Sequence, residues 1–174
     1  MTRKKIERDT EIYVSNNIYS SFSYSDDRGA SLDLTEHGDE DSLTFGELKS
    51  LASGRGKAAL QKMYLLITDV ADPEIELDDV VRQLKLEKYY NKAKELFEEK
   101  DNLSVDSFSD FLINGNLEKI KQSLEDDYLR AVIVETAVHL YSKNKIQDNI
   151  IIPVLQAIGI EDVYSYIGDI KAWN

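Results

Sequence analysis

The stretch MYLLITDVADPEIELDDVVRQLKLEKYYNKAKELF, residues 63–97, decides the fold, because the pattern of its apolar residues changes along it. Met63 to Thr68 form a continuous apolar run, which is typical of a buried strand in a central position of a sheet. Asp69 to Asp79 contain Pro73 and several acids, which indicates a connecting segment between two modules. From Val80 onward the apolar residues recur at helical spacing. The apolar side of this predicted helix consists of Leu84, Tyr89, Ala93, Leu96 and Phe97.

Upstream of this stretch the apolar residues alternate with polar ones. Glu11 to Tyr24 follow a period close to two, which predicts two half-buried strands with a turn at Asn16-Asn17. Asp26 to Gly29 form a second turn signal, since Asp tolerates turn geometry and Gly supplies positive φ. A third strand is expected from Ala30 to Leu34.

A loop and a capped helix are expected between these strands and residue 63. Glu36 to Asp41 are rich in acids and predict a loop, after which Ser42 to Thr44 lead into a helix. Thr44 and Glu47 have the spacing of a capping box. Ser53 to Gly56 end the helix, because Gly provides the left-handed cap.

Beyond residue 100 the apolar spacing stays helical. Helices are expected at Ser104 to Leu112, Leu117 to Leu124, Asp126 to Ser142, a segment ended by Gly159, and Asp162 to Ile170. Pro153 is expected to open the helix that Gly159 ends, since a missing N–H costs little in the first turn. If that helix begins near Gln147 instead, Pro153 should kink it.

Together these patterns predict an α+β fold. Residues 1–70 form a small antiparallel β-rich module with one or two short helices and a basic N-terminal arm. Residues 71–174 form a bundle of short α-helices.

Composition narrows the classes of function. The 174 residues include 21 basic and 33 acidic side chains, giving a formal net charge of -12 at pH 7. This charge opposes non-specific attraction to nucleic acid, so no direct nucleic-acid partner is expected. The chain has no cysteine, which removes disulfides and thiolate chemistry. No apolar run approaches the ~20 residues that cross a bilayer, so no membrane partner is expected.

Three motifs resemble chemical sites, and each is incomplete. Ser53 to Lys57 resembles a phosphate loop but lacks the first Gly and the final Ser or Thr of that motif. An EF-hand started at Asp33 has a threonine where the bidentate Glu belongs, so Glu36 to Asp41 are a solvated loop or at most a weak divalent site. His37 and His139 are too few for a multi-histidine metal site. We therefore predict no catalytic, cofactor-binding or metal-binding residue, and a protein that is not an enzyme.

The sequence offers two kinds of interaction residue. The basic N-terminus is either a frayed, solubilising end or an arm that becomes ordered against an acidic partner. Ten tyrosines occur along the chain, and tyrosine is favoured both at interfaces and in strands. The residues predicted to make contacts with partners are Arg3, Lys4, Lys5, Arg8, Tyr19, Tyr24 and Trp173.

Several short motifs follow one another between Ile12 and Ile167. They are Val14-Ser15-Asn16-Asn17, Phe22 with Tyr24, Arg28, Leu34 to Gly38, Phe45 to Leu51, Gly54 and Gly56 before Leu65 to Ile67, Tyr89, Arg130 to Leu140, and Ile158 to Val163. In this order they resemble a family of small virion proteins of tailed bacteriophages, encoded among head and tail genes. The resemblance implies a structural or assembly role in the virion after synthesis in the host cytoplasm. It implies other virion proteins and copies of the chain itself as partners, and no catalytic residue.

Three hypotheses about function follow. The first is a structural component of the virion, in the head, neck or tail, that contacts neighbouring subunits. The second is an acidic regulatory or inhibitory protein that presents carboxylates to a host nucleic-acid-binding factor. The third, a small enzyme, has no motif to support it.

Overall fold

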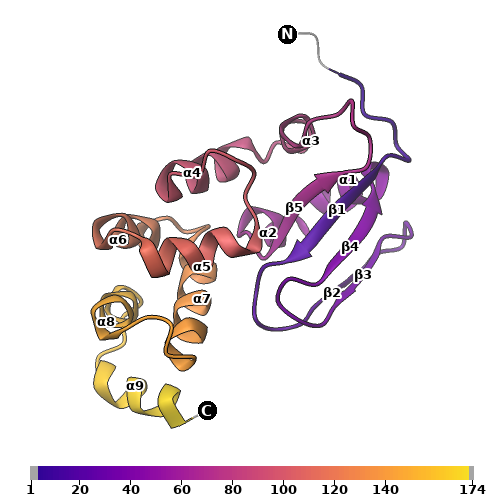
Figure 1. The fold of residues 1–174 in the computed structure, drawn as a ribbon. Helices are drawn as coiled ribbons and strands as arrows, with labels where there is room; N and C mark the ends of the chain where they lie inside the picture. The colour runs from indigo at the N-terminus through magenta and orange to yellow at the C-terminus, as the bar shows by residue number, and fades with distance from the viewer. Residues whose placement is uncertain (1–3, 173–174) are drawn as a thin grey trace.

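The computed structural model describes residues 4–172, which hold five strands and nine helices (Figure 1). All strands lie within residues 11–70, and seven of the helices follow one another from residue 77 onward. The protein is therefore α+β, with a small antiparallel sheet followed by a series of short helices, and the predicted fold class is confirmed. Residues 4–70 are called the N-terminal part below, and residues 77–172 the helical part.

The main sheet has three strands in the order β4-β1-β5. They are β1 (Glu11–Asn16), β4 (Glu40–Thr44) and β5 (Leu65–Val70), and both neighbours pair antiparallel with β1. The strand predicted at residues 63–68 exists, but its predicted central position is wrong, because β1 is central. β5 is nevertheless buried at the edge, where the Tyr90 hydroxyl accepts a 2.9 Å hydrogen bond from the backbone N–H of Ile67.

Strand β4 replaces part of the predicted acidic loop. Glu40 and Asp41 lie in the strand, and Leu43 is its one buried residue. The prediction of a loop through Asp41 was wrong because every residue of β4 except Leu43 is polar, so its sequence does not look like that of a strand. Pairing with β1, which is distant in sequence, supplies the backbone hydrogen bonds that its local composition does not favour.

A separate hairpin consists of β2 (Phe22–Ser25) and β3 (Ser31–Leu34), joined by the predicted turn at residues 26–29. The turn predicted at Asn16-Asn17 is wrong, since β1 and β2 do not pair. Both asparagines are buried instead. The side-chain amide of Asn16 donates to the carbonyls of Ser20 and Glu36, and that of Asn17 donates to the carbonyl of Met63.

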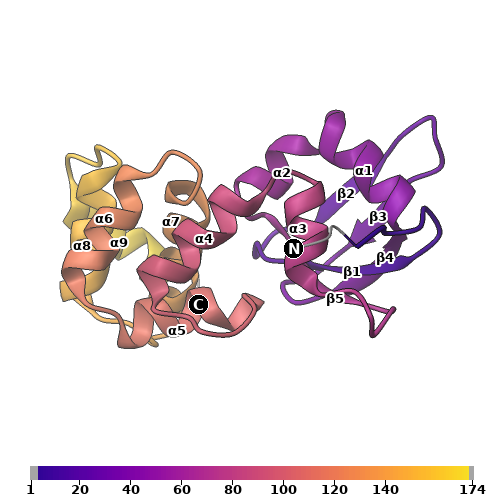
Figure 2. The ribbon, with the colours of Figure 1, turned by 90° about the horizontal axis from the view of Figure 1, so that it is seen from above.

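Two helices cover one side of the main sheet. They are α1 (Phe45–Ser53) and α2 (Lys57–Gln61), of which α1 contacts β1 and β4, and α2 contacts β5. The predicted capping box is confirmed, because the Thr44 hydroxyl accepts from the Glu47 N–H and the Glu47 carboxylate accepts from the Thr44 N–H. Figure 2 shows both helices on the same side of the strands.

The helical part contains seven short helices. They are α3 (Leu77–Gln83), α4 (Glu87–Phe97), α5 (Val105–Asn114), α6 (Leu117–Glu125), α7 (Arg130–Ser142), α8 (Asp148–Ala157) and α9 (Val163–Ala172). The single helix predicted from Val80 is two, because Lys85 has φ of +60° and turns the chain between them. Ser104 and Asn116 cap α5 and α6 as predicted.

Pro153 lies inside α8 and does not open it. The helix begins at Asp148, so the preferred prediction was wrong and the alternative start near Gln147 is correct. Ile151, Val154 and Leu155 lie on both sides of the proline and are fully buried. Their burial stabilises the helix by more than the one backbone hydrogen bond that proline removes.

One hydrophobic cluster connects the two parts. It includes Ile12 and Ile67 of the sheet together with Phe108 of α5 and Ile133 of α7. The buried side predicted for the long helix is confirmed, since Leu129, Val132, Ile133, Thr136, Ala137 and Leu140 are all 2% exposed or less. No helix within the described residues is long and apolar enough to cross a bilayer.

Candidate interaction surfaces

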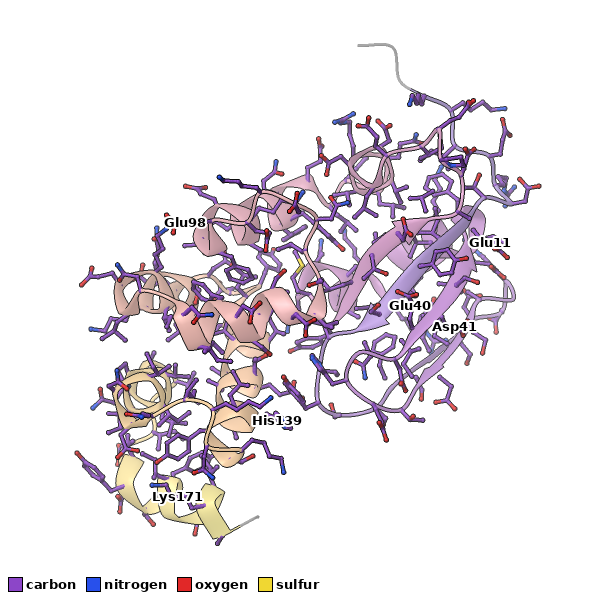
Figure 3. The ribbon with its side chains drawn as sticks, in the orientation of Figure 1. Glu11, Glu40, Asp41, Glu98, His139 and Lys171 are labelled. Atoms are coloured by element: carbon purple, nitrogen blue, oxygen red, sulfur yellow. The ribbon has the colours of Figure 1, made fainter. Side chains whose placement is uncertain are left out.

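Tyr19 lies at the junction of the two parts, between two histidine rings. Its ring stacks on His37 with centroids 4.1 Å apart and on His139 with centroids 3.7 Å apart. Two imidazoles at these distances cannot both fit on one face of the phenol, so they lie on opposite faces. His139 comes from α7 and points toward the N-terminal part (Figure 3). The stack therefore links the N-terminal part to the helical part.

Hydrogen bonds hold Tyr19 in the same place. Its backbone N–H donates to the Glu135 carboxylate of α7 at 3.0 Å. Its hydroxyl lies 3.2 Å from the Ser109 hydroxyl of α5. Tyr19, predicted to contact a partner, thus contacts the protein's own helices. We call Tyr19, His37, His139, Ser109 and Glu135 the joint.

His37 is the more enclosed of the two histidines. Burial lowers its pKa, while the carboxylates of Asp106 and Glu135 and the backbone of residues 17–18 oppose that shift. Its Nδ1 atom is buried without a hydrogen-bond partner in the part of the chain that the structure describes. The neutral ring is therefore favoured in the folded protein.

The pKa of His139 is lowered as well. Burial is the largest cause of the lowered pKa, and electrostatic interactions with Lys143, His37 and Lys145 lower it further. No group of three or more His, Cys, Asp or Glu residues between 4 and 172 is arranged to hold a metal ion. The rings of the joint lie parallel to the phenol, so their role in this geometry is packing.

Tyr24 is half-buried against the end of α1. A Cβ atom placed on Gly56 would approach the Tyr24 ring to 3.1 Å and the Leu51 side chain to 2.5 Å. The Tyr24 hydroxyl donates to the Asp26 carboxylate at 3.2 Å. Gly56 thus allows close packing under Tyr24, and the segment ends α1 as predicted. The predicted left-handed glycine cap is wrong, since φ is -108° at Gly54 and -77° at Gly56.

The described part of the basic arm contacts the protein itself. The Lys4 ammonium donates to the Glu74 carbonyl, and the Gln83 side chain donates to the Lys4 carbonyl at 2.9 Å. Ile6 is buried, and the Arg8 carbonyl accepts from the N–H of Gly46 at 2.9 Å. Residues 4–8 are therefore anchored along α3 and α1. Arg3 and Trp173, two other predicted contact residues, lie outside the described residues.

Basic side chains gather on one surface of this acidic protein. Three neighbouring hollows on α1, α2, α3 and the arm share Gln83. Their walls carry nine basic side chains and only three acidic ones, Glu47, Asp79 and Glu87. We call the nine the basic face: Lys4, Lys5, Arg8, Arg28, Lys49, Lys57, Arg82, Lys85 and Lys88. Three of the nine, Lys4, Lys5 and Arg8, are close together in the sequence and were predicted as contact residues. The other six join them only through packing, so no local pattern predicts them.

The opposite side of the main sheet is acidic. The side chains of Glu11 and Tyr13 alternate with the buried Ile12 and Val14 of β1, and the register places Thr44 and Ser42 opposite them. Ser15, which lies further along on the same side opposite Glu40, is itself buried. We call the side formed by Glu11, Tyr13, Ser15, Glu40, Ser42, Thr44 and Asp69 the open sheet face. Ser15 and its β5 partner Leu66 are buried at one end of this side, whereas Glu11, Glu40 and Asp69 are exposed on it. Figure 3 shows Glu11 and Glu40 on the sheet.

The helical part exposes an apolar groove. Ala131, Val134 and Val138 of α7 form its floor, and Ile158 and Tyr166 form its wall. Asp127, Arg130 and Glu135 form the polar rim. α7 is thus apolar on its outer side as well as its buried side, which is typical of a helix surrounded by others.

Asp39 has a structural role in the acidic segment. Its carboxylate accepts hydrogen bonds from the N–H groups of Thr35 and Glu36 and from the Thr35 hydroxyl, at 2.8 to 3.0 Å. These bonds lower its pKa. Asp39 therefore closes the turn that leads into β4.

The fold and these surfaces define a class: a small α+β protein whose sheet module is basic on one side and acidic on the other. Comparison with protein-family models, with curated proteins and with solved structures finds no match to this chain.

Proposed function

We propose that this chain is a structural or assembly component of a tailed-phage virion that acts through protein–protein contacts between neighbouring subunits. The observation that carries the proposal is the opposite charge of the basic face and the open sheet face. A subunit within a ring or a filament touches a neighbour on each side, so it needs two different contact surfaces. The order of sequence motifs supports the virion as the location.

Complementary charge suits such contacts. Charged patches steer subunits together and fix their register, while like charges exclude wrong pairings. Tyr13 lies at the centre of the open sheet face, opposite Ser42 on one side and Asp69 on the other. Tyrosine is enriched at interfaces because it buries a large area with little loss of conformational freedom.

Mass spectrometry of purified phage particles tests the proposal. The expected result is the chain at a fixed ratio to the other virion proteins. The double variant Lys49→Glu/Lys57→Glu should lower its incorporation. The matched control Lys100→Glu/Lys121→Glu changes the charge by the same amount at exposed lysines outside the basic face and should be incorporated normally. A chain that remains in the soluble lysate and is missing from particles would refute the proposal.

The second candidate is an acidic regulator of a host nucleic-acid-binding factor. The exposed carboxylates of Glu11, Glu40 and Asp69 on one side of the sheet favour it, since spaced negative charges can occupy a phosphate-binding surface. This function predicts a complex with a host DNA- or RNA-binding protein whose affinity falls steeply with salt. Glu11→Lys/Asp69→Lys should abolish that complex. Absence from particles together with such a complex would favour this candidate.

A further inference from the structure

From the two charged faces we infer that copies of this chain associate with one another head to tail, the basic face of one copy lying on the open sheet face of the next. The inference rests on the proposed function and specifies the partner as a second copy. Its basis is that the basic face and the open sheet face, which carry opposite charges, both include residues of the N-terminal part of the same chain.

The two faces lie on opposite sides of one sheet. Ile12 and Val14 of β1 point toward α1 and α2 and are fully buried, while Glu11 and Tyr13 point the other way. Lys49 on α1 and Lys57 on α2 are exposed. The positive surface is thus separated from the negative one by the thickness of a helix and a sheet (Figure 2).

This arrangement decides the type of contact. An isologous dimer would place a face against its own copy, and like charges facing each other oppose association. A contact between two different faces is heterologous and repeats from subunit to subunit. It generates a ring when the rotation closes and a filament when it does not.

Several charges on each face have no ion-pair partner among the described residues, although Lys5 and Arg82 of the basic face are paired. Arg8, Lys49 and Lys57 make no ion pair with another residue of the described chain. On the open sheet face, Glu11 and Asp69 also form no ion pair within residues 4–172. Unpaired charges of opposite sign on the two faces gain a partner only when the faces meet.

The net charge of -12 opposes the approach of a phosphate backbone and of a second copy alike, so association of two copies depends on local contact between the basic face and the open sheet face. The open sheet face offers the exposed carboxylates of Glu11, Glu40 and Asp69 around the Tyr13 ring.

Analytical ultracentrifugation of the purified full chain at low ionic strength tests the inference. The wild type should form oligomers that dissociate as salt is added, because the contact is electrostatic. Lys49→Glu/Lys57→Glu reverses two charges of the basic face, and Glu11→Lys/Asp69→Lys reverses two charges of the open sheet face. Each variant alone should associate at least about tenfold more weakly than the wild type, because like charges now meet across the contact.

Mixing the two variants gives the sharpest result. Each retains the face that is altered in the other, and the two altered faces also carry opposite charges, so complementary charges meet at both contacts. The mixture should therefore recover the salt-sensitive association that neither variant shows alone. Lys100→Glu/Lys121→Glu should oligomerise like the wild type. Circular dichroism of each variant checks that it is folded.

Three outcomes would overturn the inference: a wild type that stays monomeric at low salt, variants that associate like the wild type, or binding of labelled duplex DNA that Lys49→Glu/Lys57→Glu abolishes. A monomeric chain that is still incorporated into particles would overturn head-to-tail association and leave the proposed function standing. A chain that forms oligomers but is absent from particles would overturn the proposed function and leave head-to-tail association standing.

Discussion

Replacing Tyr19 with alanine tests whether the joint holds the two parts of the protein together. The change removes two stacked ring contacts, at 4.1 and 3.7 Å, and a hydroxyl contact with Ser109 at 3.2 Å. Each stack contributes about 0.5 to 1.5 kcal/mol and the hydrogen bond about 1 kcal/mol. Tyr19 is only half-buried, so the loss stays below that of a core aromatic residue. We expect the free energy of unfolding to fall by about 2 to 3 kcal/mol.

Urea denaturation followed by circular dichroism measures this loss. Tyr164→Ala is the matched control, because Tyr164 is 76% exposed. Its removal should change the free energy of unfolding by less than about 0.5 kcal/mol. Tyr19→Phe retains the ring and loses the hydroxyl, so it should cost only about 1 kcal/mol.

A double-mutant cycle isolates the stack itself. Tyr19→Ala combined with His139→Ala should show a coupling energy of about 1 kcal/mol, since each single change already removes the shared contact. A coupling energy of zero within error, or a Tyr19→Ala variant as stable as Tyr164→Ala, would refute the stabilising role of the joint.

Three further predictions concern pH and the core. The pKa values of His37 and His139 are lowered in the folded state, so acid protonates these rings more readily in the unfolded chain. Their contribution to stability is therefore complete above about pH 6.5 and is lost as the pH falls through their folded-state pKa values. Urea titrations at a series of pH values should show a shallower acid loss for His37→Gln/His139→Gln than for the wild type; parallel curves would contradict this. Ile133→Asp puts an unpaired charge at a fully buried position and should unfold the helical part. An unchanged melting temperature would contradict the burial of this side of α7. Tyr90→Phe leaves the buried N–H of Ile67 without its acceptor and should cost about 1 to 3 kcal/mol in urea denaturation, and no loss would contradict this role at the sheet edge.

Local signals predicted those elements whose cause is local. The capping box of Thr44 and Glu47, the caps at Ser104 and Asn116, and the buried side of α7 all depend on residues within one or two helical turns. Strand β4 was missed because its stability comes from pairing with β1, about thirty residues away in sequence. Pro153 was misplaced because the burial of α8 outweighs the preference of proline for a first turn.

The interaction surfaces divide in the same way. The basic arm was visible in the sequence because Lys4, Lys5 and Arg8 are adjacent. Lys49 and Lys57 join them only because α1 and α2 pack on the same side of the sheet. Tyr19 was predicted as a contact residue, and its contacts within the chain come from α5 and α7, which lie about ninety residues or more further along the chain.

The sequence by itself determined the class of fold and the sites of most helices, since the change from alternating to helical spacing near residue 70 selects strands first and helices afterwards. Tertiary structure alone decided which strand is central, which side of the sheet is open and which charges share a surface. The physical reason is that hydrogen-bond pairing between strands, and the packing of helices on a sheet, depend on residues distant in sequence, whose proximity no local pattern encodes.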